Sequence, residues 1–449
     1  MSTQILSEFV EGLEFNQIPQ KVIIAAKSLV LDTLGCIVSG TTEQPTKIIS
    51  STIRQFEDRN KAIVIGEDFK TSCLNAVLIH GASAHSQEFD DLYRPCTIHP
   101  GTVIIPSVLS LGEHITANGK ELLTSIVAGY EVMIRVGHAL GKTHYQYWHT
   151  TATAGVLGAS ASCSKLLHLS SEKTLDAFGN AGTQASGLWE FNIDGAMSKV
   201  LHTGRAAQNG LLSTLLAKNG FTGAKRILEG ERGLLRAASK DYNIKKLQLG
   251  LKEDYQLIKT SIKQYPTCGH THSSIEAIFN LVDKYGLRPS DIKQIIVNTY
   301  STAIDVAGTV KPKTPAQAKF SIKYCVAAAL KDREITLEQF KTCKLNDPEL
   351  SQLMNKIEVQ ADPTLNHAYP IKWPAIVVVE TVNGNQWKEE VDHPRDILND
   401  KKEMIQNKFI LLASKVIGRN NAREIVNKVF SLEKMRDISN LLSLCVRKN

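Results

Sequence analysis

The run Thr151-Ala-Thr-Ala-Gly-Val-Leu-Gly-Ala-Ser-Ala-Ser-Cys163 consists almost entirely of small residues. Small side chains let neighbouring helices approach closely, so such a segment belongs in the interior of a helical domain. Apolar residues also recur at helical spacing on either side of it, over residues 19–39, 71–88, 102–117, 120–141 and 172–188. The first half of the chain is therefore predicted to form a compact helical domain.

The pattern changes near residue 255. Residues 291–300 and 373–382 are rich in β-branched residues and are predicted as strands. Asn383-Gly384 follows the second of them and is the strongest short signal for a hairpin turn, so residues 386–391 are predicted as the returning strand. Helical periodicity lies between the strands and returns over residues 396–445.

These patterns predict a mainly α protein with two domains. A large all-helical domain is expected from residues 1–260 and 396–449, so that both ends of the chain contribute to it. A smaller α+β domain is expected as an insertion of residues 261–395. A cleft between two domains is a preferred place for a small-molecule site.

The composition limits the possible partners. Of 449 residues, 52 are Lys or Arg and 45 are Asp or Glu, which gives a formal net charge of +7. Hydrophobic residues make up 43%, which excludes a disordered or collagen-like chain. The basic residues are dispersed, unlike the basic patches of nucleic-acid-binding proteins. We therefore expect no nucleic-acid partner, and some of the cations are candidates for binding a small anion.

The cysteines and the apolar segments indicate the compartment. The eight cysteines are scattered and include no CxxC pair. The N-terminal residues lack the pattern of a secretory signal, and no window reaches the ~18 uncharged apolar residues of a membrane span. These features predict a reduced, cytoplasmic protein with no membrane partner.

Standard cofactor and nucleophile motifs are missing. The chain has no GxGxxG after a strand, no GxxxxGK followed by Ser or Thr, no HExxH and no GxSxG. Catalysis, if the chain is an enzyme, is therefore expected to depend on side chains alone, without a cofactor.

The densest polar segment is His85–Pro100, which contains two histidines, three acids and an arginine between two apolar helices. Loops that carry such groups beside rigid helices are usually functional. Two other interpretations stay open. The segment could be a solvated connection with capping acids, or Glu88, Asp90, Asp91 and His99 could bind a metal ion.

A second cluster, Tyr145-Gln-Tyr-Trp-His149-Thr, precedes the small-residue helix. A helix N-terminus offers free N–H groups and a positive dipole, which suit a carboxylate ligand. The alternative is that Tyr147 and Trp148 are packing residues and that His149 only leads into the helix.

A third cluster places Lys199, His202 and Arg205 three residues apart, roughly along one side of a helix. Three possible cations in one stripe fit a ligand with several carboxylates, for which arginine supplies a bidentate fork. The alternative is an exposed basic face.

A fourth cluster, Lys263-Gln-Tyr-Pro-Thr-Cys-Gly-His-Thr-His272, lies at the junction between the two domains. Cys268, His270 and His272 alternate as zinc ligands can, but no fourth ligand is evident nearby. Cys268 could also exchange protons if a nearby cation lowers the pKa of its thiol.

Taken in order along the chain, these clusters resemble the MmgE/PrpD superfamily, which contains 2-methylcitrate dehydratase, cis-aconitate decarboxylase and iminodisuccinate epimerase. The order and spacing hold over nearly the whole length, and the motifs are specific as a set. They are Gly81-Ala-Ser-Ala-His85, Glu88-Phe-Asp-Asp91, His99-Pro100, His149 before the small-residue helix, Lys199 with His202, Lys263-Gln-Tyr-Pro266 and the segment Lys319–Ala329.

The resemblance implies a helical domain, a smaller lid domain, a homodimer and a cofactor-free site in the cleft. It implies that His99, His149, Lys199 and Lys263 correspond to pocket residues. The chain departs from the decarboxylases in three places. Glu88 replaces a pocket aspartate, Cys268 replaces a site histidine, and a pocket tyrosine has no clear match near residues 306–310.

The clusters and the resemblance together predict a cofactor-independent lyase that acts on a small di- or tricarboxylate. It would remove an α-proton and stabilise the resulting enolate with cations. No metal is expected. The residues expected to be catalytic are His99, His149, Lys199, Cys268 and Tyr145. Those expected to bind the substrate are Glu88, Asp91, Arg94, His202, Arg205, Lys263 and His270.

Two alternatives stay open. An epimerase or isomerase of a dicarboxylic imino or amino acid needs two bases, for which Tyr145, His149, Lys199 and Cys268 are candidates. A non-catalytic carboxylate-binding protein would bind the same ligands without converting them.

Overall fold

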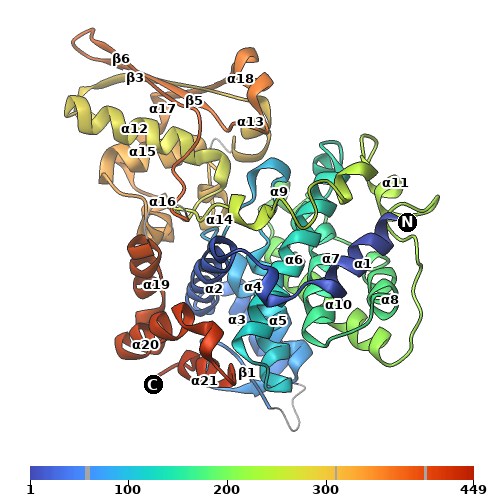
Figure 1. Cartoon of the computed structure of the whole chain (residues 1–449). Coiled ribbons are helices and arrows are strands. Elements are labelled where there is room, and N and C mark those ends of the chain that lie inside the picture. The colour runs from blue at the N-terminus through green and yellow to red at the C-terminus, as the bar shows by residue number, and fades with distance from the viewer. Residues whose placement is uncertain (56–60, 309–310, 399–401, 449) are drawn as a thin grey trace. The chain divides into compact units, whose positions relative to one another are not determined.

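The computed structural model describes the chain except residues 56–60, 309–310, 399–401 and 449 (Figure 1). The chain divides into two compact units, one made of Met1–Ile262 with Ile397–Asn449 and the other of Lys263–Asp396. Helices dominate, and a four-stranded sheet lies in the second unit. The predicted mainly α fold with a smaller α+β part is confirmed.

The first unit is built almost entirely from helices, with a short antiparallel pair of strands, β1 (Ala62–Ile63) and β2 (Lys70–Thr71). Its helices are α1 (Ser2–Gly12), α2 (Gln20–Gly40), α3 (Gln44–Arg54), α4 (Cys73–His85), α5 (Gly101–Ile115), α6 (Gly119–Leu140), α7 (Thr150–Leu166), α8 (Ser171–Gly182), α9 (Phe191–Asp194), α10 (Ser198–Lys218), α11 (Leu234–Ala238), α19 (Lys402–Ile417), α20 (Arg419–Phe430) and α21 (Ser439–Leu442).

The small-residue helix α7 lies at the centre of this unit. All of its residues except Lys165 are buried, and it packs against α5, α6, α8 and α10. Close approach explains its composition. A Cβ added at Gly158 would lie 2.6 Å from the Cβ of Met133 on α6, and one at Gly210 of α10 would lie 2.4 Å from the Cβ of Ala159. Larger side chains would push these helices apart.

The helix α2 is long and apolar enough to cross a membrane by length and composition alone. However, 94% of its most apolar window is buried inside the protein. It packs against α4 and α19, so its apolar surface is covered by other helices of the same unit. This is the environment of a core helix.

The second unit contains a four-stranded sheet in the order β4-β3-β5-β6, with β3 parallel to β4 and the other pairs antiparallel. Helix α12 packs against β5 and β6. The strands are β3 (Ile292–Thr299), β4 (Ile357–Ala361), β5 (Ala375–Thr381) and β6 (Gln386–Val391), and the helices are α12 (His272–Tyr285), α13 (Ser301–Ala307), α14 (Pro315–Lys319), α15 (Ile322–Asp332), α16 (Thr342–Leu345), α17 (Pro348–Asn355) and α18 (Pro363–Ala368).

The hairpin predicted at Asn383-Gly384 is present between β5 and β6. Gly384 has a φ of 83°, in the left-handed region that glycine adopts without strain, and its N–H donates to the carbonyl oxygen of Thr381. Strand β4 was not predicted. It pairs with β3, but it covers only five residues, Ile357–Ala361, and buries only Ile357, so its local signal is weak.

Candidate functional site

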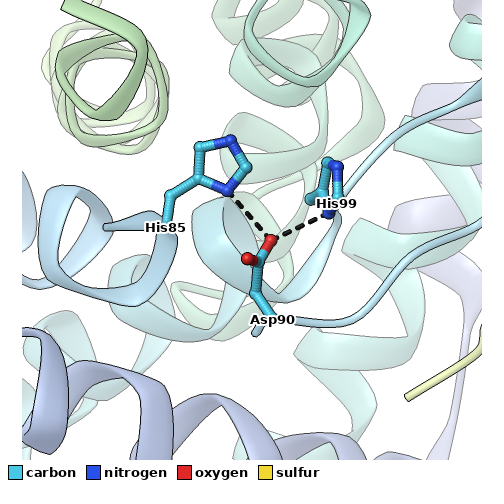
Figure 2. Close-up of side chains that lie close together, drawn as sticks. All are labelled: His85, Asp90 and His99. Atoms are coloured by element: carbon cyan, nitrogen blue, oxygen red, sulfur yellow. Dashed lines mark hydrogen bonds and ion pairs between the residues drawn. The ribbon is translucent and has the colours of Figure 1, made fainter. Parts of the chain in front are cut away.

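A buried cluster of three side chains lies where α4 ends and α5 begins. His85 is the last residue of α4, Asp90 follows in the connecting segment, and His99 lies two residues before Gly101, the first residue of α5. Asp90 Oδ2 is 2.9 Å from His85 Nδ1 and 2.8 Å from His99 Nδ1. Figure 2 shows both rings turned toward this one oxygen. A single carboxylate therefore holds two imidazoles.

These contacts fix which nitrogen of each ring carries a proton. A carboxylate only accepts hydrogen bonds, and His99 Nδ1 also lies 2.6 Å from the carbonyl oxygen of Asp91, a second acceptor. Nδ1 of both rings must therefore donate, which leaves Nε2 as the basic nitrogen of each neutral ring. His85 Nε2 is buried with no hydrogen-bond partner among the described residues. Burial, followed by the nearby Lys199, lowers the pKa of His85 to about 4.

The ligand atoms of His85, Asp90 and His99 lie within 4.8 Å of one another, the only such metal-compatible group found among the described residues. Their N···O separations of 2.8 and 2.9 Å are ordinary hydrogen-bond lengths. Glu88 and Asp91, the other possible metal ligands, bond elsewhere. We therefore interpret the cluster as a hydrogen-bonded set.

Asp91 lies in a structural position at the start of α5. Its carboxylate accepts hydrogen bonds from the backbone N–H of Gly101 at 3.0 Å and from the Tyr130 hydroxyl at 2.8 Å. Burial, and then the neighbouring Asp90 and Asp32, raise the pKa of Asp91 against these two hydrogen bonds. Asp91 thus anchors the end of the segment that carries Asp90, and its contact with a substrate stays a prediction.

Lys199, the second residue of α10, forms an ion pair with Glu88 through Oε1, and both side chains are buried. Glu88 has a φ of 57°, an uncommon left-handed conformation for a residue other than glycine. Such conformations persist where surrounding contacts hold them and are concentrated at functional sites. The ion pair is one contact that holds Glu88.

The three residues predicted to form one stripe on α10 do not share one environment. Lys199 is buried and His202 is half-buried, whereas Arg205 is exposed and donates to Gln208 Oε1 on its own helix. The physical reason is the helical rotation of about 100° per residue, which turns each third residue by about 60°. Two such steps carry Arg205 away from Lys199, and the structure does not bring this arginine to the cluster.

His149, the N-cap residue of α7, extends the cluster. Its ring stacks on His85, with centroids 5.4 Å apart and planes 19° apart, and its Nδ1 lies 3.4 Å from Nδ1 of His202. Trp189 and Phe191 border the same ring, with centroids 5.5 and 6.5 Å away. The imidazoles therefore lie beside an aromatic wall.

Burial lowers the pKa values of His149 and His202 and so determines their charge. Burial, and then His85 and Lys199, lower the pKa of His149 well below its usual range. Burial and Lys199 lower the pKa of His202 to about 4. At neutral pH these rings are neutral proton acceptors.

Three helices begin at this cluster. His99 precedes α5, His149 caps α7, and Lys199 lies in the first turn of α10. The backbone N–H of His99 also donates to Thr151 Oγ1 on α7 at 3.2 Å, which joins two of these termini. Helix N-termini carry partial positive charge and attract anions. The surroundings of the neutral imidazoles thus favour a carboxylate.

Two further predicted residues lie nearby in the sequence of the first unit. Tyr145 is half-buried, and its ring meets Trp189 edge-on at 5.1 Å. Arg94 begins a short helical turn, Arg94–Cys96, in the segment between Asp90 and His99. Their roles stay predictions.

Lys263, Cys268 and His270 belong to the second unit, and all three are buried. His270 stacks on Trp373 at 4.2 Å, and its Nδ1 lies 2.6 Å from the Tyr300 hydroxyl. The backbone N–H of Cys268 donates to the carbonyl oxygen of Lys319 and so connects two of the family motifs. Among the described residues, this segment forms no metal-compatible group.

The fold and the site define a mainly helical protein with a buried His-Asp-His cluster and an adjacent lysine–glutamate pair. The chain belongs to the MmgE/PrpD family: residues 4–247 match the MmgE/PrpD N-terminal domain and residues 265–432 match the MmgE/PrpD C-terminal domain. The resemblance inferred from the sequence is confirmed.

Several relatives of known name cover most of the chain. It is 27% identical to a cis-aconitate decarboxylase of Aspergillus terreus over 98% of this chain and 95% of the relative. It is 28% identical to cis-aconitate decarboxylase of Homo sapiens over 98% and 94%. It is 22% identical to 2-methylcitrate dehydratase of Cupriavidus necator over 77% and 74%. These identities do not fix one activity for this chain.

Sequence reasoning assigned no role to His85, Trp189 or Phe191. His85 stands in a family motif, but its partnership with Asp90 depends on the turn after α4. Trp189 lies between α8 and α9. It is held at the site by its backbone N–H, which donates to the carbonyl oxygen of Tyr147 at 3.0 Å, and by its indole N–H, which donates to the carbonyl oxygen of Trp148 at 2.9 Å. No periodicity in the sequence signals such a contact.

Proposed function

We propose that this protein is a cofactor-independent lyase that acts on a small di- or tricarboxylate. The observation that carries the proposal is the shared carboxylate of Asp90, which orients the imidazoles of His85 and His99. The named relatives, cis-aconitate decarboxylases and a 2-methylcitrate dehydratase, support the substrate class.

In the proposed reaction, Lys199 binds a substrate carboxylate with the help of the three helix N-termini. His99 Nε2 accepts the proton from the carbon next to that carboxylate, while Asp90 stabilises the resulting imidazolium. The electron pair left on carbon delocalises into the carboxylate as an enolate, and Lys199 stabilises this charge.

The finer reaction type determines what happens next. In a dehydration, the electron pair forms the double bond and expels the hydroxyl group, which takes a proton from an imidazolium and leaves as water. In a decarboxylation, the bond to the leaving carboxylate breaks instead. No proton is removed beforehand: the electron pair of that bond passes into the unsaturated acid, and an imidazole that has taken a proton from solvent delivers it to carbon.

A second candidate is an epimerase or isomerase of a dicarboxylic imino or amino acid. It is supported by the presence of two imidazoles from different elements next to His85, because His99 and His149 have ring centroids 4.9 and 5.4 Å from it. One base could remove a proton and a second return it.

A single incubation panel separates these reactions. The protein is mixed in D2O with cis-aconitate, 2-methylcitrate, citrate and iminodisuccinate, and proton NMR follows each acid. Loss of carbon dioxide or water supports the lyase, whereas deuterium exchange at the α-carbon without either loss supports the epimerase. Thermal stabilisation by an acid that is never converted would instead support a carboxylate-binding protein.

A matched pair of variants tests the assigned base. His99→Asn should reduce turnover of the converted acid by about 10²–10⁴-fold. His114→Asn replaces an exposed histidine on α5 and should leave turnover unchanged. Equal rates in the two variants would remove His99 from the mechanism.

A further inference from the structure

Lys408, on helix α19, contacts the segment Glu88–Asp91 between α4 and α5, which is called the site segment. Its ammonium group donates to the carbonyl oxygen of Phe89 at 2.6 Å and lies 3.9 Å from the centre of the Phe89 ring. It is also 2.7 Å from Asp32 Oδ1 on α2. Phe89 stands between Glu88 and Asp90, so the lysine contacts the backbone at the middle of the site segment.

These contacts are made away from water. Lys408, Asp32 and Phe89 are all buried. A charge-assisted hydrogen bond is stronger than a neutral one, and a cation over an aromatic ring gains strength when both are desolvated. Together the contacts fix both the carbonyl group and the ring of Phe89, and so restrict the peptide that leads into Asp90.

Lys408 also supplies positive charge to a group of buried carboxylates. Asp90 and Asp32 both lie close enough to Asp91 to raise the pKa of its carboxyl, after the larger effect of burial. Without the ammonium group, mutual repulsion would favour protonation of one carboxylate. A protonated Asp90 would be a weaker acceptor for both Nδ1–H groups, because hydrogen bonds to an ionised carboxylate are stronger than those to a neutral group.

We propose that Lys408 is a positioning residue of the site: by holding Phe89 and Asp32, it keeps Asp90 in place as the shared acceptor of His85 and His99. The proposal rests on the proposed function for its kinetic consequence. Its structural consequence, the state of the two imidazoles, requires no known substrate.

Lys27 provides a matched control within the same unit. It is a buried lysine on α2 whose ammonium group donates to the carbonyl oxygen of Phe430 at 3.1 Å and pairs with Glu433. Its chemistry is that of Lys408, a buried ammonium bound to one backbone carbonyl and one carboxylate, but among the described residues its ammonium group bonds to Phe430 and Glu433 and not to the site segment. Lys27→Met should therefore reproduce the loss of stability without the loss of positioning.

The experiment compares Lys408→Met with Lys27→Met in the full chain. The Nδ1–H protons of His85 and His99 are followed by proton–nitrogen NMR, with assignments from His85→Asn and His99→Asn. We expect Lys408→Met to lose or shift both signals and to lower kcat by about 10²-fold, with KM changed by less than about threefold. Lys27→Met should keep both signals and the wild-type kcat.

Lys408→Met could fail to fold because it leaves Asp32 buried without its cation. The double variant Asp32→Asn/Lys408→Met removes both charges and keeps the test decisive. Retention of both Nδ1–H signals in a folded Lys408 variant, or an equal loss in Lys27→Met, would overturn the proposal. If wild-type protein converts no acid, the proposed function fails, and the NMR comparison still decides the role of Lys408.

Discussion

The rings of His85 and His149 are stacked, with centroids 5.4 Å apart and planes 19° apart, although they come from different helices. Two imidazolium ions could not share this buried position, because each would raise the free energy of the other. Burial lowers the pKa of both histidines, and the proximity of His85 lowers that of His149 further. The resting site therefore presents neutral bases next to the paired charges of Lys199 and Glu88.

The shared acceptor of the two imidazoles can be tested with Asp90→Asn. An amide oxygen is neutral and accepts more weakly than a carboxylate, so it should hold the two Nδ1–H groups less firmly and should not stabilise an imidazolium. We expect kcat for the converted acid to fall by about 10²–10⁴-fold, as for other histidines that lose an orienting carboxylate. Steady-state kinetics measure the effect, and Asp68→Asn, at an exposed ion pair with Arg54, serves as the control. An unchanged kcat in Asp90→Asn would contradict the assigned role.

The influence of Lys199 on its neighbours can be tested by NMR titration of His202. Burial is the larger cause of the lowered pKa of His202, and the Lys199 charge is the second. Lys199→Met should therefore move the titration of His202 from about 4 toward its ordinary value near 6.5. The pKa of His138, also about 4, is lowered by burial and by Lys246, Arg135 and Lys259, so it should not move. Equal shifts in both histidines would show that the substitution acts through a general change in the fold.

The sequence predicted those elements whose signal is local. The small residues of α7 and the turn at Asn383-Gly384 each specify their own conformation, and both are present. Strand β4 was missed because it covers only five residues, Ile357–Ala361, and buries only the first of them. Among the site residues, Lys199 and His99 were found by chemical type and by family resemblance.

The contacts that organise the site could not be predicted in the same way. The role of Asp90 as a shared acceptor depends on the turn between α4 and α5, and Lys408 comes from the far end of the chain. The position of Arg205 on its helix also differs from the expectation, and its contact with a substrate stays a prediction. Its spacing from Lys199 suggested one stripe, but helical rotation turns it toward solvent, where it bonds to Gln208.

Acid should destabilise the first unit through its buried neutral histidines, with His80 as the clearest case. The backbone N–H of Ile65 donates to His80 Nε2 at 2.8 Å, and Nδ1 lies 3.0 Å from Ser110 Oγ. Burial lowers the pKa of His80 to about 3, below that of the unfolded chain. The unfolded state therefore binds the proton first, and stability present above pH 6.5 is lost as the pH falls toward 3.

As the pH falls through this window, the free energy of unfolding should decrease by about 1.4 kcal/mol per pH unit because of His80 alone. Urea unfolding between pH 7 and 4.5 measures the slope. His80→Gln should be less stable at pH 7 but show a slope shallower by one proton, whereas His168→Gln, at an exposed position, should keep the wild-type slope. A slope that is the same in wild type and His80→Gln would show that His80 is not protonated on unfolding.

Glu88 should oppose the binding of an anionic ligand, because a substrate carboxylate must compete with it for Lys199. Glu88→Gln keeps the size of the side chain and removes its charge, so tricarballylate, a saturated tricarboxylate that cannot lose water, should bind more tightly. We expect its Kd to fall by about 10–150-fold, the range of a charge-assisted hydrogen bond of about 1.5–3 kcal/mol. Isothermal titration calorimetry measures Kd, and Glu433→Gln, at the Lys27 pair, should leave it unchanged. Weaker binding in Glu88→Gln would show instead that Glu88 orients Lys199 for the ligand, because loss of orientation would then outweigh the relief of competition.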